Sequence, residues 1–204
     1  MTQGGPRVGV LISGRGSNLQ ALIDAAAADR LGGRVAVVIS NVAGAPGLQR
    51  AAQAGIPAEV RDHRERPRED HDRAMLEVLR AHGVELVCLA GYMRLLSPTF
   101  VRAFPARILN VHPSLLPAFP GTDAVRQALV HGVKVTGATV HLVDEGLDSG
   151  PIVAQEAVPV EDDDTEETLA ARVLEAEHRI FPRAARLVLS GVTVAGRRVH
   201  GGAA

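Results

Sequence analysis

Continuous apolar stretches alternate along this chain with stretches in which apolar residues recur every three or four positions. The continuous stretches predict buried strands, and the periodic ones predict amphipathic helices. The predicted strands are Val8–Ile12, Val35–Ser40, Leu86–Ala90, Ile108–Val111, Val135–Val143 and Ile152–Val158. The predicted helices are Asn18–Ala28, Pro46–Ala54, Arg68–Ala81, Asp123–His131 and Thr165–Leu189.

The order of these elements predicts an α/β fold. Strand–helix alternation implies right-handed crossovers and a Rossmann-like, mostly parallel sheet with helices on both faces. The alternation ends late in the chain, where Val135–Val143 and Ile152–Val158 are joined by a loop without a helix. Strands joined in this way run antiparallel. We therefore expect a mixed sheet with a late antiparallel strand pair.

The length of 204 residues suits one domain with one sizeable core. We expect this domain to span residues 1–190. The Gly-rich residues 191–204 predict a tail that is a fraying hairpin or a disordered end. Thr165 is the expected N-cap of the last helix, because Thr165-Glu-Glu-Thr168 provides a polar first turn.

Composition narrows the function classes. The net charge of −1 and the 2% of aromatic residues argue against a nucleic-acid partner. No segment approaches the length of a membrane span, and no secretory leader precedes the first strand. The single cysteine, Cys88, is expected to be a small core residue. These features predict a soluble protein of the cytoplasm.

Ser13–Leu19 follows the first strand and opens the first helix. Its glycines permit close approach of a ligand, and the free N–H groups of a helix N-terminus favour a phosphate. A dinucleotide fingerprint would place a third glycine where Leu19 stands, so NAD is excluded. Ser17 and Asn18 add donors that suit a phosphate monoester. The alternative is a tight turn with a Ser or Asn cap.

The segment Ala90–Pro98 follows a buried strand and is mostly apolar. Such a loop at the carboxyl end of a strand can line a pocket for a flat heterocycle. The alternative, which the pattern alone favours, is a packing loop that ends at a Ser97 cap with Pro98 in the first helical position.

Asn110-Val-His112-Pro-Ser-Leu-Leu-Pro117 combines a strand end with polar chemistry. Residues two apart on a strand share a face, so Asn110 and His112 project together at an edge where α/β proteins bind ligands. An amide donor beside an imidazole suits a reaction in which charge develops on a carbonyl oxygen. The alternative is a buried, hydrogen-bonded pair that only terminates the strand.

The loop 143–151 is longer than a tight turn between two strands requires. Its Asp148 is the candidate partner of His112, whereas Asp144 and Glu145 also suit an exposed acidic turn. Thr139 and His141 alternate on the preceding strand and face the same cleft in this interpretation, although a core or surface His is equally compatible with the spacing. The eight histidines show no ligand spacing, so no metal site is predicted. Ser114 lacks a nucleophile elbow.

Together these motifs resemble the formyltransferase family that uses 10-formyltetrahydrofolate. Within it they resemble the members that formylate phosphoribosylglycinamide in purine biosynthesis. The resemblance covers about Val8 to Pro182. It rests on Asn110-x-His112-Pro-Ser-Leu-Leu-Pro117 with Asp148, on Ser13-Gly-x-Gly-Ser-Asn-Leu19, on Leu89–Pro98 and on Glu177-His178.

The resemblance implies a role for each matching residue. Asn110, His112 and Asp148 would be catalytic, with Thr139 and His141 in support. Gly16, Ser17, Asn18 and Arg68 would hold the substrate phosphate side, and Glu177 the ribose hydroxyls. The formylated folate would lie against Met93, Arg94, Leu95 and Leu96 and against the loop that carries Asp144 and Asp148.

One departure is local, because Thr122-Asp123 stands where the family often has a His two residues after Pro120-Gly121. The reaction that the resemblance implies is direct transfer of the formyl group from 10-formyltetrahydrofolate to the glycyl amine, without a metal. Both ligands are small molecules, and the protein is expected to be a monomer or homodimer. Two alternatives are a hydrolase of the same folate and a non-catalytic folate- or phosphate-binding module.

Overall fold

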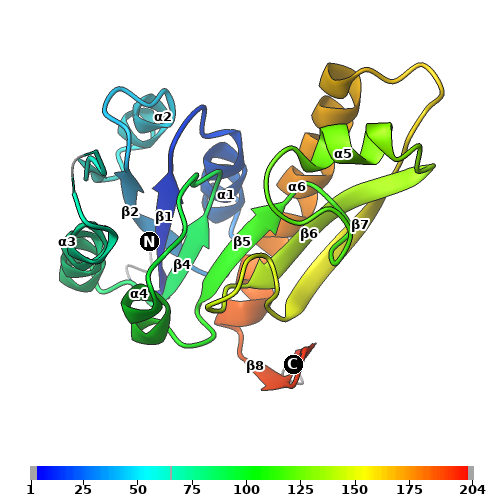
Figure 1. Cartoon of the computed structure of the whole chain (residues 1–204). Coiled ribbons are helices and arrows are strands. Elements are labelled where there is room, and N and C mark those ends of the chain that lie inside the picture. The colour runs from blue at the N-terminus through cyan, green and yellow to red at the C-terminus, as the bar shows by residue number, and fades with distance from the viewer. Residues whose placement is uncertain (1–3, 65, 202–204) are drawn as a thin grey trace.

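The computed structural model describes residues 4–64 and 66–201 and contains one nine-stranded sheet in the order β3-β2-β1-β4-β5-β6-β7-β9-β8 (Figure 1). The strands are β1 (Arg7–Ile12), β2 (Arg34–Ser40), β3 (Ala58–Val60), β4 (Leu86–Leu89), β5 (Ile108–His112), β6 (Val135–Leu142), β7 (Ile152–Pro159), β8 (Val192–Ala195) and β9 (Arg198–Gly201). The helices are α1 (Ser17–Ala27), α2 (Gly47–Gln53), α3 (Arg68–Ala81), α4 (Pro98–Ala103), α5 (Ala124–Val130) and α6 (Glu166–Leu189).

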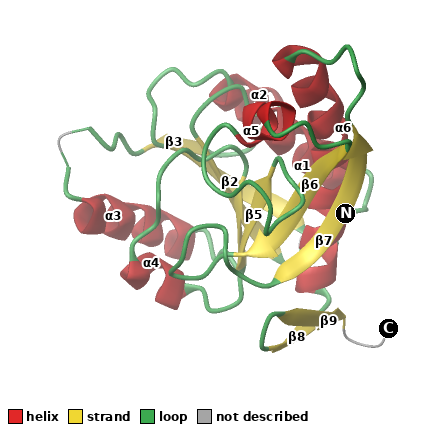
Figure 2. Cartoon of the chain, turned by 45° about the vertical axis from the view of Figure 1, so that its right-hand side comes forward, coloured by secondary structure: helices red, strands yellow, loops and turns green. Residues whose placement is uncertain are grey.

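Helices cover both faces of the sheet, as the continuous apolar strands predicted. Side chains alternate between the faces, so one strand supplies two cores. In β4, Leu86 and Cys88 pack in the core beneath α1 and α6, whereas Val87 and Leu89 pack in the core beneath α3 and α4. Figure 2 shows α3 and α4 on one side of the sheet and α1 and α6 on the other. Cys88 is fully buried, as expected of a core residue.

The pairing of the strands changes from parallel to antiparallel halfway across the sheet. Strands β3, β2, β1, β4 and β5 are mutually parallel, whereas β6 runs antiparallel to β5 and to β7. This confirms the prediction of a mostly parallel mixed sheet with a late antiparallel pair. The carboxyl ends of the parallel strands lie at the top in Figure 1, and the loops that follow them gather there.

Besides the two strands of the C-terminal hairpin, two elements were missing from the predicted set. Strand β3 has only three residues and a half-exposed edge position, so it carries no buried apolar run. Helix α4 has six residues, too few to show a period. The alternative interpretation of Ala90–Pro98 identified its start, because the Ser97 side chain accepts from Phe100 N and Pro98 follows in the first turn.

Strands β8 and β9 form a hairpin over Val192–Gly201, one of the two forms expected of the Gly-rich end. Strand β9 continues the sheet, since Arg198 pairs with Ile152 of β7. Thr165 caps α6 as expected, with Thr165 and Thr168 bonding reciprocally through side chain and backbone. Among residues 4–64 and 66–201, no helix is both long and apolar enough to cross a membrane.

Candidate active site

The pairing of β5 with β6 brings four polar residues onto one face of the sheet. Asn110 lies opposite His141, and His112 lies opposite Thr139. Directly opposed residues of antiparallel strands project to the same side, and so do residues two apart on one strand. His112, Thr139 and His141 are all buried. The register therefore fixes the four side chains as one rigid cluster.

Asp148 joins this cluster from the loop between β6 and β7. Its carboxylate lies 3.5 Å from His112 Nδ1 and 3.6 Å from His141 Nε2. The N–H of Gly121 donates to Asp148 Oδ2 at 2.8 Å. Asp148 itself adopts a left-handed backbone conformation, with φ of +48°. The loop is long enough to fold back on the sheet, so that the Asp148 carboxylate reaches both His112 and His141.

The surroundings of Asp148 favour its ionised form. Burial raises the pKa of this carboxyl, but hydrogen bonding from His141 and from Gly121 N–H, together with the charge of His112, outweighs that effect. The net result is a pKa below the ordinary value of an aspartic acid. A negative charge is therefore held beside the two imidazoles.

Backbone carbonyls determine which ring nitrogens carry protons. His112 Nε2 lies 2.8 Å from Phe119 O, and His141 Nδ1 lies 3.0 Å from Leu142 O. A carbonyl can only accept, so each of these nitrogens must donate. The nitrogen of His112 that can exchange its proton is therefore Nδ1, which faces Asp148.

Asn110 is held by the other nitrogen of His141. Asn110 Nδ2 lies 3.2 Å from His141 Nε2. This nitrogen accepts from the amide when the ring is neutral, and it donates to Asp148 instead when the ring is charged. The amide has a second N–H on the same nitrogen. The His141 contact therefore fixes the amide while leaving one donor for another group.

Thr139 holds the proline-rich segment after β5 in place. Its Oγ1 accepts from Leu116 N at 3.0 Å and donates to Ser114 O at 2.7 Å. Gln155 Nε2 donates to the same hydroxyl at 3.0 Å and to Leu116 O at 2.9 Å. No motif points to Gln155, because its place opposite Thr139 follows from the β6–β7 register.

The loop after β1 turns sharply at Gly16. This residue has a φ of +72°, and a side chain there would come within 2.7 Å of the Gly47 Cα atom. Gly16 is the N-cap of α1, and no side chain bonds to the end of the helix. The alternative of a Ser or Asn side-chain cap is therefore wrong. The first N–H groups of α1 keep the free donors that an anion requires.

Asn18 turns inward and bonds to Glu177 of α6. Asn18 Nδ2 donates to Glu177 Oε2 at 2.6 Å, and both residues are 7% exposed. Burial raises the pKa of Glu177 to about 7, and the bond from Asn18 offsets only part of this effect. The two residues are 159 positions apart in the chain, so spacing could not have paired them.

The loop after β4 is tied to the loops after β1 and β3. Ser13 Oγ accepts from Met93 N at 2.8 Å and donates to Asn41 Oδ1 at 2.7 Å. Arg94 donates to His63 O at 3.1 Å. Met93 and Leu95 are nevertheless 78% and 58% exposed. Two exposed apolar side chains close together on an anchored loop form a small apolar surface that a ligand could cover.

Three of the predicted site residues stay apart from these clusters. Arg68 is the exposed first residue of α3, and the described contacts do not join it to Gly16 or Glu177. Asp144 is exposed and accepts from Gly146 N and Ser149 Oγ, so it supports the shape of the acidic loop. Leu96 is partly buried against the core beneath α3 and α4.

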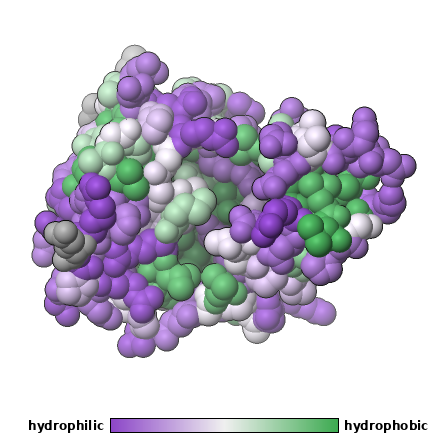
Figure 3. Space-filling model, turned by 45° about the horizontal axis from the view of Figure 1, so that its top comes forward, coloured by the Kyte–Doolittle hydropathy of each residue, from purple (hydrophilic) through white to green (hydrophobic). Residues whose placement is uncertain are grey.

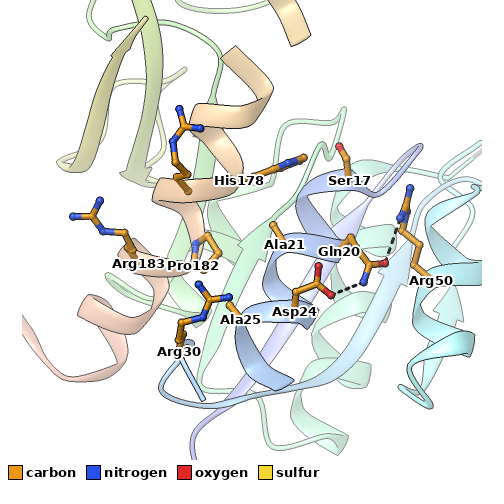
Figure 4. Close-up of a pocket in the computed structure, with 11 residues that line it drawn as sticks. Ser17, Gln20, Ala21, Asp24, Ala25, Arg30, Arg50, His178, Pro182 and Arg183 are labelled. Atoms are coloured by element: carbon orange, nitrogen blue, oxygen red, sulfur yellow. Dashed lines mark hydrogen bonds between the residues drawn. The ribbon is translucent and has the colours of Figure 1, made fainter. Parts of the chain in front are cut away.

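The surface at the carboxyl ends of the parallel strands is hollowed, with apolar patches near the hollow (Figure 3). A further cavity of about 630 Å³ lies between α1, α2 and α6. Figure 4 shows its basic lining and the chain of bonds from Arg50 through Gln20 to Asp24. Ser17 borders this cavity, whereas Asn110, His112 and Asp148 do not line it. Its basic residues are Arg30, Arg50, His178, Arg179 and Arg183.

Known proteins resemble the chain over nearly its whole length. The profile of a family described as formyl transferase matches residues 6–185. The trifunctional purine biosynthetic protein adenosine-3 of Gallus gallus is 51% identical over 191 residues, which are 93% of this chain but 19% of that protein. The chain thus spans about a fifth of this much longer relative. Phosphoribosylglycinamide formyltransferase of Mycobacterium tuberculosis (strain H37Rv) is 49% identical over 195 residues, covering 94% of this chain and 89% of that protein.

Solved structures give the same picture. Glycinamide ribonucleotide transformylase 1 from Symbiobacterium toebii superimposes with a TM-score of 0.94 at 56% identity, covering 97% of this chain and 94% of that chain. A formyltetrahydrofolate deformylase from Pseudomonas syringae superimposes with a TM-score of 0.91 at 29% identity. This chain covers 66% of the deformylase and is itself covered to 98%.

Proposed function

We propose a function from the premise that this chain belongs to the formyl transferase family. The chain transfers a formyl group from 10-formyltetrahydrofolate to the glycyl amine of phosphoribosylglycinamide, a step of purine biosynthesis. The relatives of similar length that carry this activity in their names support the proposal. So does the group of Asn110, His112 and Asp148 at the carboxyl end of β5.

The neutral amine attacks the formyl carbon, and negative charge develops on the formyl oxygen. The free N–H of Asn110 and the Nδ1–H of His112 donate to this oxygen. Donors of this kind contribute roughly 2.7–4 kcal/mol each in enzymes where one has been removed. The bonds of Asn110 to His141 and of His112 to Phe119 O orient both donors before the reaction begins.

Asp148 orients His112 and assists the proton transfer. The attacking amine must lose a proton, and folate N10 must gain one as the C–N bond breaks. The ionised carboxylate beside His112 Nδ1 accepts the first proton and returns it towards N10, directly or through a water molecule. No covalent enzyme intermediate is required, in agreement with the absence of a nucleophile motif in the sequence.

The acceptor binds at the start of α1. Gly16, Ser17 and Asn18 surround its phosphate through free backbone N–H groups. Arg68, which has no contact with this loop among the described residues, is proposed to add positive charge from α3. Glu177, held by Asn18, contacts the ribose hydroxyls. The basic lining of the neighbouring cavity favours the approach of an anion to Ser17 (Figure 4).

The formylated folate lies across the hollow. Its pterin ring packs against Met93, Arg94, Leu95 and Leu96 on one side and against the loop that carries Asp144 and Asp148 on the other. The exposed Met93 and Leu95 side chains support this position. Thr139 and His141 support the cluster from β6.

Residues 1–190 form the single formyltransferase domain, and 191–204 form a C-terminal tail whose β8–β9 hairpin joins the sheet at β7. The protein acts in the cytoplasm as a monomer or homodimer on two small molecules, without a metal, a nucleic acid or a membrane. Among the described residues, no group of three or more His, Cys, Asp or Glu is arranged to hold a metal ion.

The observation that carries the proposal is that Asn110 and His112 share one face of β5 and that the Asp148 carboxylate lies 3.5 Å from His112 Nδ1. The test is to incubate the protein with 10-formyl-5,8-dideazafolate, a stable folate analogue, and to follow its absorbance with and without phosphoribosylglycinamide. Deformylation that requires the acceptor is the expected result. Loss of the formyl group at an equal rate without acceptor would show a hydrolase, and binding without turnover would show a binding module.

The hydrolase is the second candidate, because the structurally similar deformylase shares the fold. The free helix end at Gly16 and the Asn18–Glu177 pair argue against it, since water as an acceptor needs neither. The two activities are separated by the requirement for acceptor in the same assay.

A further inference from the structure

Helix α3 buries a carboxylate that the proposed mechanism does not use. Asp72 and its neighbour His71 are both fully buried. A charged group away from water is costly unless it is paired and hydrogen-bonded. The contacts of Asp72 therefore indicate why a carboxylate is buried at this position.

Asp72 accepts a short hydrogen bond from the loop after β4. Asp72 Oδ2 lies 2.6 Å from Ser97 N, and Asp72 Oδ1 lies 3.4 Å from His71 Nδ1. His71 Nε2 in turn lies 2.7 Å from Arg61 O, in the loop after β3. The pair thus bonds to two loops at the carboxyl edge of the sheet and not only to the core.

Ser97 depends on this bond. It is fully buried, so water cannot satisfy its N–H, and an unpaired buried donor is costly. Its own hydroxyl is already used, because it accepts from Phe100 N to cap α4. Asp72 therefore fixes the end of the loop where the chain enters α4.

The loop between Gly91 and Ser97 is held at three points. Its start is fixed by Ser13, which bonds to the backbone of Gly91 and Met93. Its middle is fixed where Arg94 donates to His63 O, and its end is fixed by Asp72. Loss of the bond between Asp72 and Ser97 N would free the half of the loop that carries the exposed Leu95.

We propose that Asp72 is a positioning residue for the formylated folate: through Ser97 N it holds the loop 91–97 in the conformation that binds the pterin ring. The proposal rests on the proposed function, because that function places the folate against this loop. Asp72 does not touch the reacting atoms. Its loss should therefore weaken folate binding and leave the chemical step and acceptor binding largely unchanged.

The test compares Asp72→Asn with Asp70→Asn. Asparagine keeps the volume of Asp72 and an acceptor for Ser97 N but removes the charge that strengthens the bond. Asp70 provides the same chemical change two residues away on α3, where its carboxylate is exposed and pairs with Arg73. We expect Asp72→Asn to raise the KM for the formylated folate by about tenfold, equivalent to about 1.4 kcal/mol. kcat and the KM for the acceptor should stay within about twofold, and Asp70→Asn should match the wild type.

Hydrogen exchange of the segment 92–97 provides a readout that does not depend on the function. Its amides should exchange about tenfold faster in Asp72→Asn than in the wild type and Asp70→Asn. An unchanged exchange rate in Asp72→Asn would show that Asp72 does not hold this loop in place. Faster exchange with an unchanged folate KM would overturn the positioning role. A wild-type protein that neither binds nor consumes the folate analogue would instead refute the proposed function.

Ser97→Ala is the second test of the proposal, to be used if Asp72→Asn does not fold. Alanine removes the cap on Phe100 N but keeps the backbone N–H that bonds to Asp72. It loosens the same loop end without touching the buried carboxylate. We expect a rise in folate KM of about threefold, in the same direction as for Asp72→Asn, because one neutral hydrogen bond is lost. A fall in kcat without a change in folate KM would contradict the proposal.

Discussion

The two halves of the sheet present their polar groups in different ways. In the parallel half, the ends of β1 and β4 lead into loops at Gly16 and Met93 that offer backbone N–H groups and exposed side chains. In the antiparallel half, β5 and β6 present side chains in fixed cross-strand pairs, with His112 and His141 buried.

Under the proposed function, the two halves would have different roles. Loops at strand ends can adapt to the shape of a ligand, whereas a cross-strand cluster holds donors at fixed positions, as stabilisation of a transition state requires. Binding would then depend mainly on the parallel half and catalysis on the antiparallel half. The antiparallel turn of the sheet is what places Thr139 and His141 beside the end of β5.

Replacing Asp148 with Asn should have the largest effect. The variant keeps the bond from Gly121 N–H but loses the charge beside His112. We expect kcat for formyl transfer to fall by at least about a hundredfold while the thermal midpoint stays close to that of the wild type. Asp162→Asn, a change at an exposed carboxylate, is the control and should keep full activity. Near-normal turnover of Asp148→Asn would contradict a catalytic role for the antiparallel half.

Gly16→Ala should affect binding more than turnover. The substitution strains a positive φ and brings the new Cβ within 2.7 Å of the Gly47 Cα atom. We expect the KM for phosphoribosylglycinamide to rise by about ten- to hundredfold through the displaced loop, with a much smaller change in kcat. Gly132→Ala imposes similar strain at a φ of +65° with no atom near the new Cβ, so it controls for the general loss of stability. Equal KM values for the two variants would contradict a phosphate site at Gly16.

Glu177→Gln should change how stability depends on pH. The folded pKa of Glu177 is about 7, above the ordinary value of 4.5, so the folded state binds the proton more tightly than the unfolded state does. Its contribution to stability is therefore fully present below the unfolded pKa and is lost as pH rises towards the folded pKa. Between pH 5 and pH 8 the wild type should lose roughly 1–3 kcal/mol relative to Glu177→Gln, measured by urea unfolding. If the stability of the wild type and of Glu177→Gln changed with pH in the same way, the pKa of Glu177 would not be raised in the folded state.

Ser13→Ala should have the smallest effect. It removes the hydroxyl that joins Met93 N to Asn41, while the loop keeps its contacts through Arg94 and Ser97. We expect the KM for the formylated folate to rise by about two- to tenfold, as the loss of one neutral hydrogen bond predicts. Ser190→Ala, on the exposed end of α6, is the matched control. A fall in kcat alone would place Ser13 in the catalytic group instead.

The elements that the sequence predicts well are those with strong periodicity. The buried strands, α3 and the capped α6 agree with expectation, because burial on one or both faces imposes a pattern on the residues. Short elements such as β3 and α4 bury too little to impose one. The hairpin at the chain end gains order from the edge of β7, a contact that its own Gly-rich sequence does not encode.

The candidate site was predictable where one strand carries it. Asn110 and His112 share a face by strand geometry alone, but their pairing with His141 and Thr139 depends on the register between two strands. The Asn18–Glu177 bond and the Asp72–Ser97 bond join residues distant in sequence, and burial there is set by tertiary packing. Long-range contacts of this kind leave no local pattern in the chain.

The measurement that best separates catalysis from binding is a single-turnover experiment on Asn110→Ala. The affinities for 10-formyl-5,8-dideazafolate and for phosphoribosylglycinamide would be measured by calorimetry on the same preparation as the transfer rate. If Asn110 stabilises the oxyanion, both affinities stay within about threefold of the wild type while the rate at saturation falls by about 10²–10³-fold. A loss of affinity with an unchanged rate at saturation would contradict a catalytic role for the antiparallel half.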